Sequence, residues 1–231
     1  MLGKITSNRW RIPVAVLAFA CLGHSARAQT LTFEGLQDFE AVGNYYSGQL
    51  GGNGSGPGPN FGVSFSPSAL ALISVDSGGS GDFGGNPSGN TALFFLTDTA
   101  YTMDVSTGFA GTFSVFYSSP SVPGTISLYS GLDATGSLLG TLGLATTPFM
   151  GDGMHAYSPF VFASLAFTGV AKSVDFGSSA NLFAYDDIAI TTVPEPGLLP
   201  LASTLVLCGI GFTRRIYRSR RSRKHSPSAA V

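Results

Sequence analysis

Apolar residues recur in short runs through the long middle of the chain, and glycine, proline, serine and asparagine interrupt them about every 8 to 12 residues. In one run, Phe113, Val115 and Tyr117 alternate with Thr112 and Ser114. Successive side chains of a strand point to opposite faces, so this period of two predicts strands with one buried face.

The pattern predicts eleven short strands, at residues 30–33, 62–65, 69–75, 91–96, 101–105, 112–117, 125–129, 137–144, 160–167, 173–176 and 183–190. Many short strands separated by turn residues are typical of sandwiches and barrels. The expected fold class is therefore all-β, a jelly-roll-like β-sandwich ectodomain over residues 29–192. Glycine-rich loops at 47–62 and 76–90 are expected to be flexible, or to form a ligand-facing pair at one rim.

The distribution of charge separates this middle region from the two ends. The 231 residues include 12 lysines and arginines, of which only Lys172 lies in the region, together with 12 of the 13 acids. One base against twelve acids gives the region a formal charge of −11. Such a region has no footprint for nucleic acid or for anionic phosphates, so we expect no nucleic-acid partner.

Residues 1–28 have the three parts of a secretory signal peptide. Basic residues are followed by the apolar run 12–22 and then by Ala26-Arg27-Ala28, which places small residues two positions apart. We expect cleavage after Ala28, which leaves Gln29 as the first residue. The alternative is an uncleaved anchor, but an 11-residue apolar run is short for crossing a membrane.

The other end, residues 193–224, combines three features in a row. The motif Val193-Pro194-Glu195-Pro196 is followed by an apolar run at 198–212 and by a basic tail at 214–224 that includes Arg214, Arg215 and Arg218. We expect the apolar run to be a short transmembrane helix. The basic residues that stop it stay in the cytoplasm, which puts the body of the protein outside. Residues 225–231 form a polar tail.

This terminus closely resembles the PEP-CTERM sorting signal of Gram-negative bacteria, in which a V-P-E-P motif, a short span and an arginine cluster occur in this order. The resemblance implies an exosortase partner, a membrane cysteine protease, that recognises Pro194, Glu195 and Pro196. It also implies an exported protein: first an inner-membrane-anchored precursor, then a protein of the cell surface or extracellular matrix, usually with exopolysaccharide or biofilm. Paired prolines fit a protease motif because they hold the backbone extended. A plain single-pass anchor is the alternative.

Few residues of the middle region suit catalysis. It has no thiol and no disulfide, because Cys21 and Cys208 lie in the two ends. Its single histidine, His155, lies in no nucleophile motif, and we expect a loop histidine with a structural or solvated role. We therefore predict no catalytic residues and a protein that is not an enzyme. The alternative is a carbohydrate-active hydrolase displayed by the same signal, which two facing carboxylates would reveal.

Carboxylates near both ends of the middle region point to calcium, which binds hard oxygen ligands. Glu34 follows the first expected strand, and Asp186 and Asp187 lie in the last. In strand number, in its T-F-E-G opening and in its D-D-I closing strand, the region resembles galactose-binding-like jelly rolls, which are common in carbohydrate-binding modules. The resemblance implies paired first and last strands that hold a structural calcium ion with these three residues. Otherwise one aspartate faces water and the other caps a turn or accepts from a backbone amide.

Tyr45 and Tyr46 flank the first glycine-rich loop and are the expected surface pair for a sugar ligand. Neighbouring strand residues face opposite sides, so at most one of them would line a given face. Together these features predict an exported structural or adhesive protein that binds exopolysaccharide. With Lys172 as its one base, the region would need neutral sugars, or calcium bridges to a polyanionic one.

Overall fold

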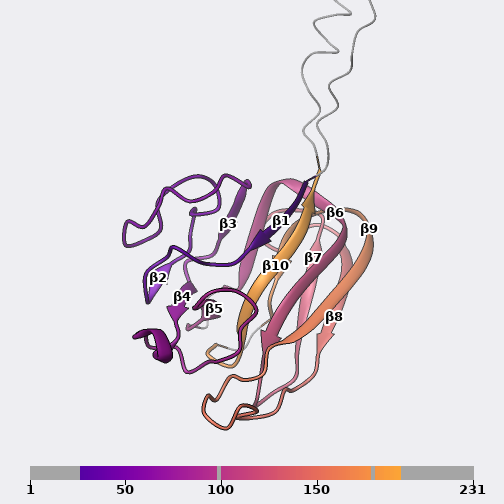
Figure 1. The fold of residues 1–231 in the computed structure, drawn as a ribbon. Coiled ribbons are helices and arrows are strands. Elements are labelled where there is room, and N and C mark those ends of the chain that lie inside the picture. Colours follow the sequence, from indigo (N-terminus) through magenta and orange to yellow (C-terminus); the bar gives the residue numbers. More distant parts are fainter. Residues whose placement is uncertain (1–26, 98–99, 178–179, 194–231) are drawn as a thin grey trace, which may run out of the picture.

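The structure, a computed structural model, describes residues 27–97, 100–177 and 180–193 (Figure 1). Within this part, the chain forms ten strands and one short 3-10 helix, and the prediction of an all-β fold is confirmed. The elements are β1 (Arg27–Leu31), β2 (Glu40–Ala41), β3 (Val63–Phe65), β4 (Ala69–Ile73), η1 (Val75–Ser77), β5 (Thr91–Phe95), β6 (Thr102–Ser118), β7 (Gly124–Tyr129), β8 (Leu138–Leu144), β9 (Val161–Asp175) and β10 (Ala184–Thr192).

The strands pair antiparallel in the order β2-β4-β5-β10-β6-β9-β7-β8, with β1 added on β10 and β3 added on β6. They curl around one apolar core, so that two layers face each other in a jelly-roll-like sandwich (Figure 1). β1 pairs along its whole length with β10, from Arg27 opposite Thr192 to Leu31 opposite Ile188. This confirms the expected pairing of the first and last strands.

Two pairs of expected strands are each one long strand. β6 continues through the gap expected after residue 105, and β9 continues through the gap expected after residue 167. The glycines in these gaps take positive φ inside the strands: 80° at Gly108, 87° at Gly111 and 95° at Gly169. The register between β6 and β9 shifts in the same place. Glycine adopts positive φ at little cost, so it bends the strands at bulges and does not end them.

The main core lies between the two layers. Phe113, Val115 and Tyr117 of β6 are buried in it, as their alternation predicts. Several of its aromatic rings meet edge to face, and the ring centroids of Phe176 and Tyr185, for example, are 5.0 Å apart. Because the region has no cysteine, burial of these rings is the principal source of its stability.

A smaller apolar cluster covers the outer face of β4 and β5. Phe94 of β5 points away from the main core, and its ring centroid lies 5.9 Å from that of Phe83, in the segment before β5. It also lies 5.3 Å from the ring of Tyr157, which belongs to the connection between β8 and β9. These contacts pack the segment before β5 and the β8–β9 connection against the outer face of the sheet.

The chain enters and leaves the sandwich at one end, because the first residue of β1 pairs with the last of β10. The connection between β8 and β9 lies at the opposite end (Figure 1). Of the predicted processing positions, Ala28 and Gln29 lie in β1, and Val193 follows β10. The others lie outside the described residues, namely Ala26, Pro194, Glu195, Pro196, Arg214, Arg215, Arg218 and the predicted helix at 198–212. Within the described part, no helix has the length and apolar character needed to cross a membrane.

Candidate functional site

An aromatic pair lies on the outer face of the sheet. Phe116 of β6 and Phe162 of β9 are directly opposite in the register, with ring centroids 5.2 Å apart. Both point away from the core, because Val115 and Tyr117 on either side of Phe116 point into it. Phe162 is 56% exposed. The sheet therefore presents an aromatic ring to solvent.

Small side chains continue this outer face along the two strands. Ser114 lies opposite Ser164, and Thr112 lies opposite Ala166. None of the four is buried. We call the outer face made by these four residues and the phenylalanine pair the aromatic strip. It combines an aromatic ring at one end with hydroxyl groups beside it, on an open sheet surface.

Asp186 of β10 lies opposite Phe116 in the register. Its side chain is fully buried under the loop before β5. The Ser88 N–H and hydroxyl, each at 3.2 Å, and the Asn86 side-chain amide at 3.3 Å donate hydrogen bonds to its carboxylate. Burial raises the pKa of Asp186 to about 7 in spite of these donors, and the Asp187 carboxylate adds to the rise.

Of the other two predicted calcium ligands, Asp187 is the next residue after Asp186, and Glu34 contacts the end of the loop that covers Asp186. Glu34 accepts hydrogen bonds from the backbone N–H groups of Asn90 at 2.9 Å, at the end of this loop, and of Thr91 at 2.8 Å, at the start of β5. Asp187 Oδ1 is buried and has no hydrogen-bond partner, and such an oxygen suits a hard cation. Across residues 27–97, 100–177 and 180–193, however, no three histidine, cysteine, aspartate or glutamate side chains are grouped so as to hold a metal ion.

Tyr45 and Tyr46, the predicted sugar-binding pair, lie in the core. They are 7% and 2% exposed, and their rings meet edge to face with centroids 5.3 Å apart. Tyr46 accepts a hydrogen bond from the Phe33 N–H, and the Tyr45 hydroxyl donates to the Glu34 carbonyl at 3.1 Å. The prediction that one of them lines a surface is wrong. They lie in a turn, where both rings fold inward and find partners for their hydroxyl groups.

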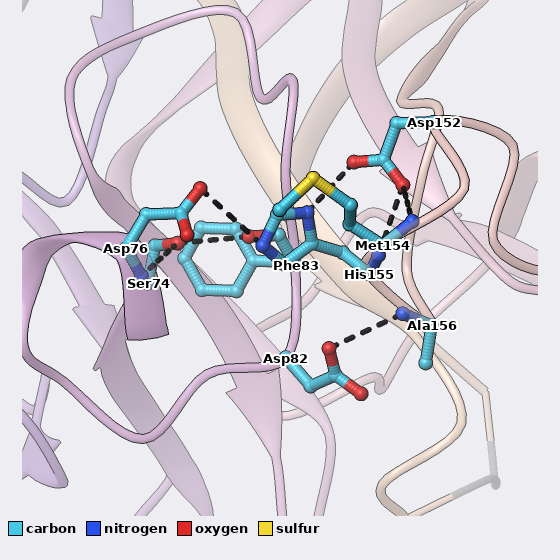
Figure 2. A network of polar contacts seen from close by, with 8 residues as sticks. All are labelled: Ser74, Asp76, Asp82, Phe83, Asp152, Met154, His155 and Ala156. Carbon is cyan, nitrogen blue, oxygen red and sulfur yellow. Dashed lines mark hydrogen bonds and ion pairs between the residues drawn. The ribbon is translucent and has the colours of Figure 1, made fainter.

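A network of polar contacts joins two loops at the end of the sandwich (Figure 2). His155, in the β8–β9 connection, is 6% exposed. Its Nδ1 lies 2.7 Å from a carboxylate oxygen of Asp152, and its Nε2 lies 3.3 Å from one of Asp76 in η1. The hydrogen bond to Asp152 raises the pKa of His155, and the charge of Asp76 adds to the rise. Hydrogen bonds from the backbone and ring of His155 hold the pKa of Asp152 well below its usual value.

Backbone contacts reinforce this junction. The Asp82 carboxylate accepts from the Ala156 N–H at 3.3 Å, and the Asp82 carbonyl accepts from the Tyr157 N–H at 3.1 Å. The β8–β9 connection is thereby held in place, while its large apolar side chains at Phe149 and Met154 remain exposed.

The contacts of this network stabilise the two loops and do not have the geometry of a catalytic site. Asp76 and Asp152 bind opposite nitrogens of one imidazole ring, whereas a glycosidase directs two carboxyl groups at one bond of its substrate. Both ring nitrogens of His155 face carboxylates, so neither is free to activate a serine as a catalytic base does.

Neither the aromatic strip nor the polar network was predicted from the sequence. The position of Phe116 in its strand could nevertheless have indicated the strip. Phe116 continues the outward positions of Thr112 and Ser114, and an aromatic residue on the polar side of an alternating strand indicates a surface contact. Asp152 and His155 are three residues apart, but Asp76 comes from a distant loop, and no local pattern reveals that contact.

No protein-family model matches the chain, and no curated protein sequence matches it. A family 6 carbohydrate-binding module whose binding sub-sites were dissected by crystallography and calorimetry is 18% identical, covers 55% of this chain and 85% of the module, and has a TM-score of 0.35. The CsCBM6-3 module from Clostridium stercorarium, solved with cellobiose, is 17% identical over 56% of this chain and 86% of that one, with a TM-score of 0.35.

A third solved structure is an arabinoxylan arabinofuranohydrolase of glycoside hydrolase family 43 from Bacillus subtilis, in complex with cellotetraose. It is 19% identical over 56% of this chain and 26% of that one, with a TM-score of 0.36. None of these likenesses places the chain in a family. What the described residues define is an all-β sandwich with an exposed aromatic strip and two loops tied together at one end.

Proposed function

We propose that this chain is an exported cell-surface module with a structural or adhesive role, and that it binds polysaccharide through the aromatic strip. The observation that carries the proposal is the exposed Phe162 ring beside Phe116, on an open sheet face with hydroxyl groups. A sugar has apolar C–H faces and hydroxyl edges, so it suits an aromatic ring flanked by Ser114 and Ser164.

The charge of the body favours neutral over acidic polysaccharides. In the described part, the lysine and arginine side chains are Arg27 and Lys172, against eleven aspartates and glutamates. A polyanionic chain would be repelled, most strongly at low salt. The expected ligand is a neutral exopolysaccharide, or an acidic one bridged by calcium.

The position of the strip suits display on a surface. Phe116 lies opposite Asp186, six positions before Thr192 at the end of β10. At about 3.3 Å per residue, roughly 20 Å separates the aromatic pair from the point where the chain leaves the sandwich. The proposed exosortase motif begins at Val193, so attachment or processing there would leave the aromatic pair at the end of the strip that is farther from the membrane.

We also propose a structural calcium ion that draws on Glu34, Asp186 and Asp187. In the described residues these three side chains are not grouped around one point, so binding would require them to move closer together. Its support is the buried Asp187 Oδ1, which has no hydrogen-bond partner, next to the fully buried carboxylate of Asp186. A hard cation would neutralise carboxylates that are costly to bury as ions.

Retention on polysaccharide tests the proposed function. The full-length chain, kept in mild detergent, is applied to an insoluble neutral glucan and to an anionic polysaccharide, with Phe162→Ala as the test variant. Leu138→Ala is the matched control, because Leu138 is also 56% exposed but lies on β8. Loss of an aromatic anchor is expected to weaken retention on the neutral matrix at least about tenfold, or 1.4 kcal/mol, with the control unchanged.

Equal retention of Phe162→Ala and the parent would remove the strip from the proposal. Failure of the parent to be retained on any matrix would contradict polysaccharide binding. Release of shortened sugars from the matrix would instead favour a displayed hydrolase.

A further inference from the structure

His155 faces carboxylates on both sides of its ring, and the two come from different loops (Figure 2). Asp152 belongs to the β8–β9 connection and lies 2.7 Å from Nδ1, whereas Asp76 belongs to η1 and lies 3.3 Å from Nε2. The Asp76 side chain is mostly exposed, while that of His155 is buried. The imidazole therefore joins a solvent-facing turn to a packed loop.

Only the doubly protonated ring can donate to both carboxylates. A neutral imidazole has one N–H and one lone pair, so it donates to one neighbour and turns its lone pair toward the other. Asp152 is closer to the ring and also accepts from the His155 backbone N–H at 2.9 Å. A neutral ring therefore keeps Asp152 as its partner, and the contact it loses is the one to Asp76.

We propose that protonated His155 latches η1 to the β8–β9 connection, and that opening of this latch at higher pH weakens carbohydrate binding at the neighbouring aromatic strip. The second half of this inference rests on the proposed function. The latch itself rests only on the geometry of the His155 ring and its two carboxylates.

The latch and the strip share one packed segment. The β8–β9 connection leads directly into β9, whose second residue is Phe162. Just before it, the Phe160 ring packs on Phe83 with centroids 6.1 Å apart. The Ser74 hydroxyl, at the start of η1, donates to the Phe83 carbonyl at 2.9 Å. Movement of η1 therefore acts on Phe83, and through it on the segment that positions Phe162.

The titratable groups at the junction are Asp76 and Asp152, which contact the ring, and Asp82 and Tyr157, which bond the segments beside it. Asp82, in the segment before β5, accepts from the backbone of the connection. Tyr157 donates its hydroxyl to the Asn181 carbonyl, and burial together with the charge of Asp82 raises its pKa, so it stays neutral. These contacts do not depend on the proton of the imidazole. They hold the connection when the ring is neutral, and only η1 is released.

The direction of the pH dependence follows from linkage. The two carboxylates raise the pKa of His155 above its ordinary value of 6.5, so the closed latch holds its proton more tightly than the open one. Closure is fully favoured below pH 6.5 and is lost as the pH rises through the raised pKa. Each unit by which the pKa is raised corresponds to a tenfold change in the closure equilibrium.

Two measurements on the full-length chain in detergent test the latch. Histidine ring NMR signals, assigned by their loss in His155→Gln, give the pKa, and hydrogen exchange gives the protection factors of the η1 amides. In the parent, the pKa is expected above 6.5, and protection of η1 is expected to fall about tenfold per unit of that rise as the latch opens. Asp76→Asn should lower the pKa and leave η1 weakly protected at every pH. Asp133→Asn, which removes an exposed charge elsewhere, should change neither.

Retention on neutral glucan over the same pH range tests the coupling. The parent and Asp133→Asn should lose retention as the latch opens, and Asp76→Asn should bind weakly at every pH. The latch is contradicted if the pKa of His155 has its ordinary value, or if the protection factors of the η1 amides do not change with pH. A latch that titrates while retention stays constant overturns the coupling. Absence of retention at every pH contradicts the proposed function and the coupling with it, while the NMR and exchange results still decide the latch.

Discussion

The hydroxyl of Tyr46 accepts a hydrogen bond from the backbone N–H of Phe33, with 2.6 Å between the heavy atoms. The two rings also meet edge to face, with centroids 5.8 Å apart. Phe33 lies two residues beyond the end of β1, outside the register in which β1 pairs with β10, and has a φ of 62°. The Tyr46 hydroxyl is thus the acceptor for a backbone N–H that no neighbouring strand pairs with. Burial raises the pKa of Tyr46, so the hydroxyl stays protonated.

Tyr46→Phe is expected to destabilise the chain by about 1–3 kcal/mol, because it leaves the Phe33 N–H buried without a partner. Denaturant unfolding measures the loss. Tyr45→Phe is the matched control: its hydroxyl donates to the Glu34 carbonyl in a partly buried position, where water can replace it, so a smaller loss is expected. If the two variants lose the same free energy of unfolding, the hydrogen bond of Tyr46 contributes no more to stability than that of Tyr45.

The fold class could be predicted because alternation is a local signal. Phe113, Val115 and Tyr117 are buried as their spacing indicates. The lengths of the strands could not, because glycine favours both turns and bulges. From the sequence, Gly108 and Gly111 predict the end of a strand. In the structure, β6 pairs with β9 on one side and β10 on the other, and the pairing with β9 continues past both glycines. Which role a glycine takes depends on neighbours that are distant in sequence.

The candidate site was harder to predict, because its contacts join distant segments. The glycine-rich loop at 47–62 reads as flexible, yet the buried Glu40 carboxylate accepts from the N–H groups of Asn53 at 2.8 Å and Ser55 at 3.0 Å. The same carboxylate accepts from the Gln37 N–H at 2.6 Å. The Glu40 carboxylate thus orders a glycine-rich loop that buries too little apolar surface to become ordered by itself.

Glu40→Gln is expected to destabilise the chain by about 1–3 kcal/mol at pH 7, because an amide N–H₂ would face backbone donors. Burial raises the pKa of Glu40, but its hydrogen bonds outweigh burial and leave the pKa below 4.5. The stability that the carboxylate contributes is therefore present above pH 4.5 and is lost as the pH falls through the lowered pKa. Denaturant unfolding at pH 7 and near pH 3 should show the difference between parent and variant shrinking in acid. A difference that stays constant would mean that ionised Glu40 does not hold the loop.

Asp186 is expected to make stability depend on pH and on calcium together. Burial raises its pKa to about 7, so the ionised form is penalised in the folded chain. Without calcium, its contribution is most favourable where the acid is protonated, and declines as the pH rises from the ordinary value of 3.8 through about 7. A cation held beside Asp187 Oδ1 would favour the ionised form and oppose this decline.

Thermal unfolding of the full-length chain with calcium and with chelator, at pH 5.5 and pH 8, tests the proposed ion. At ten times its Kd, calcium is expected to add about 1.4 kcal/mol. The gain should be larger at pH 8, because carboxylate ligands must be ionised to bind the metal. Asp187→Asn should lose the gain and Asp133→Asn should keep it. A gain of equal size in both variants would place calcium elsewhere in the chain, and no gain in the parent at pH 8 would mean that Asp186 and Asp187 hold no calcium.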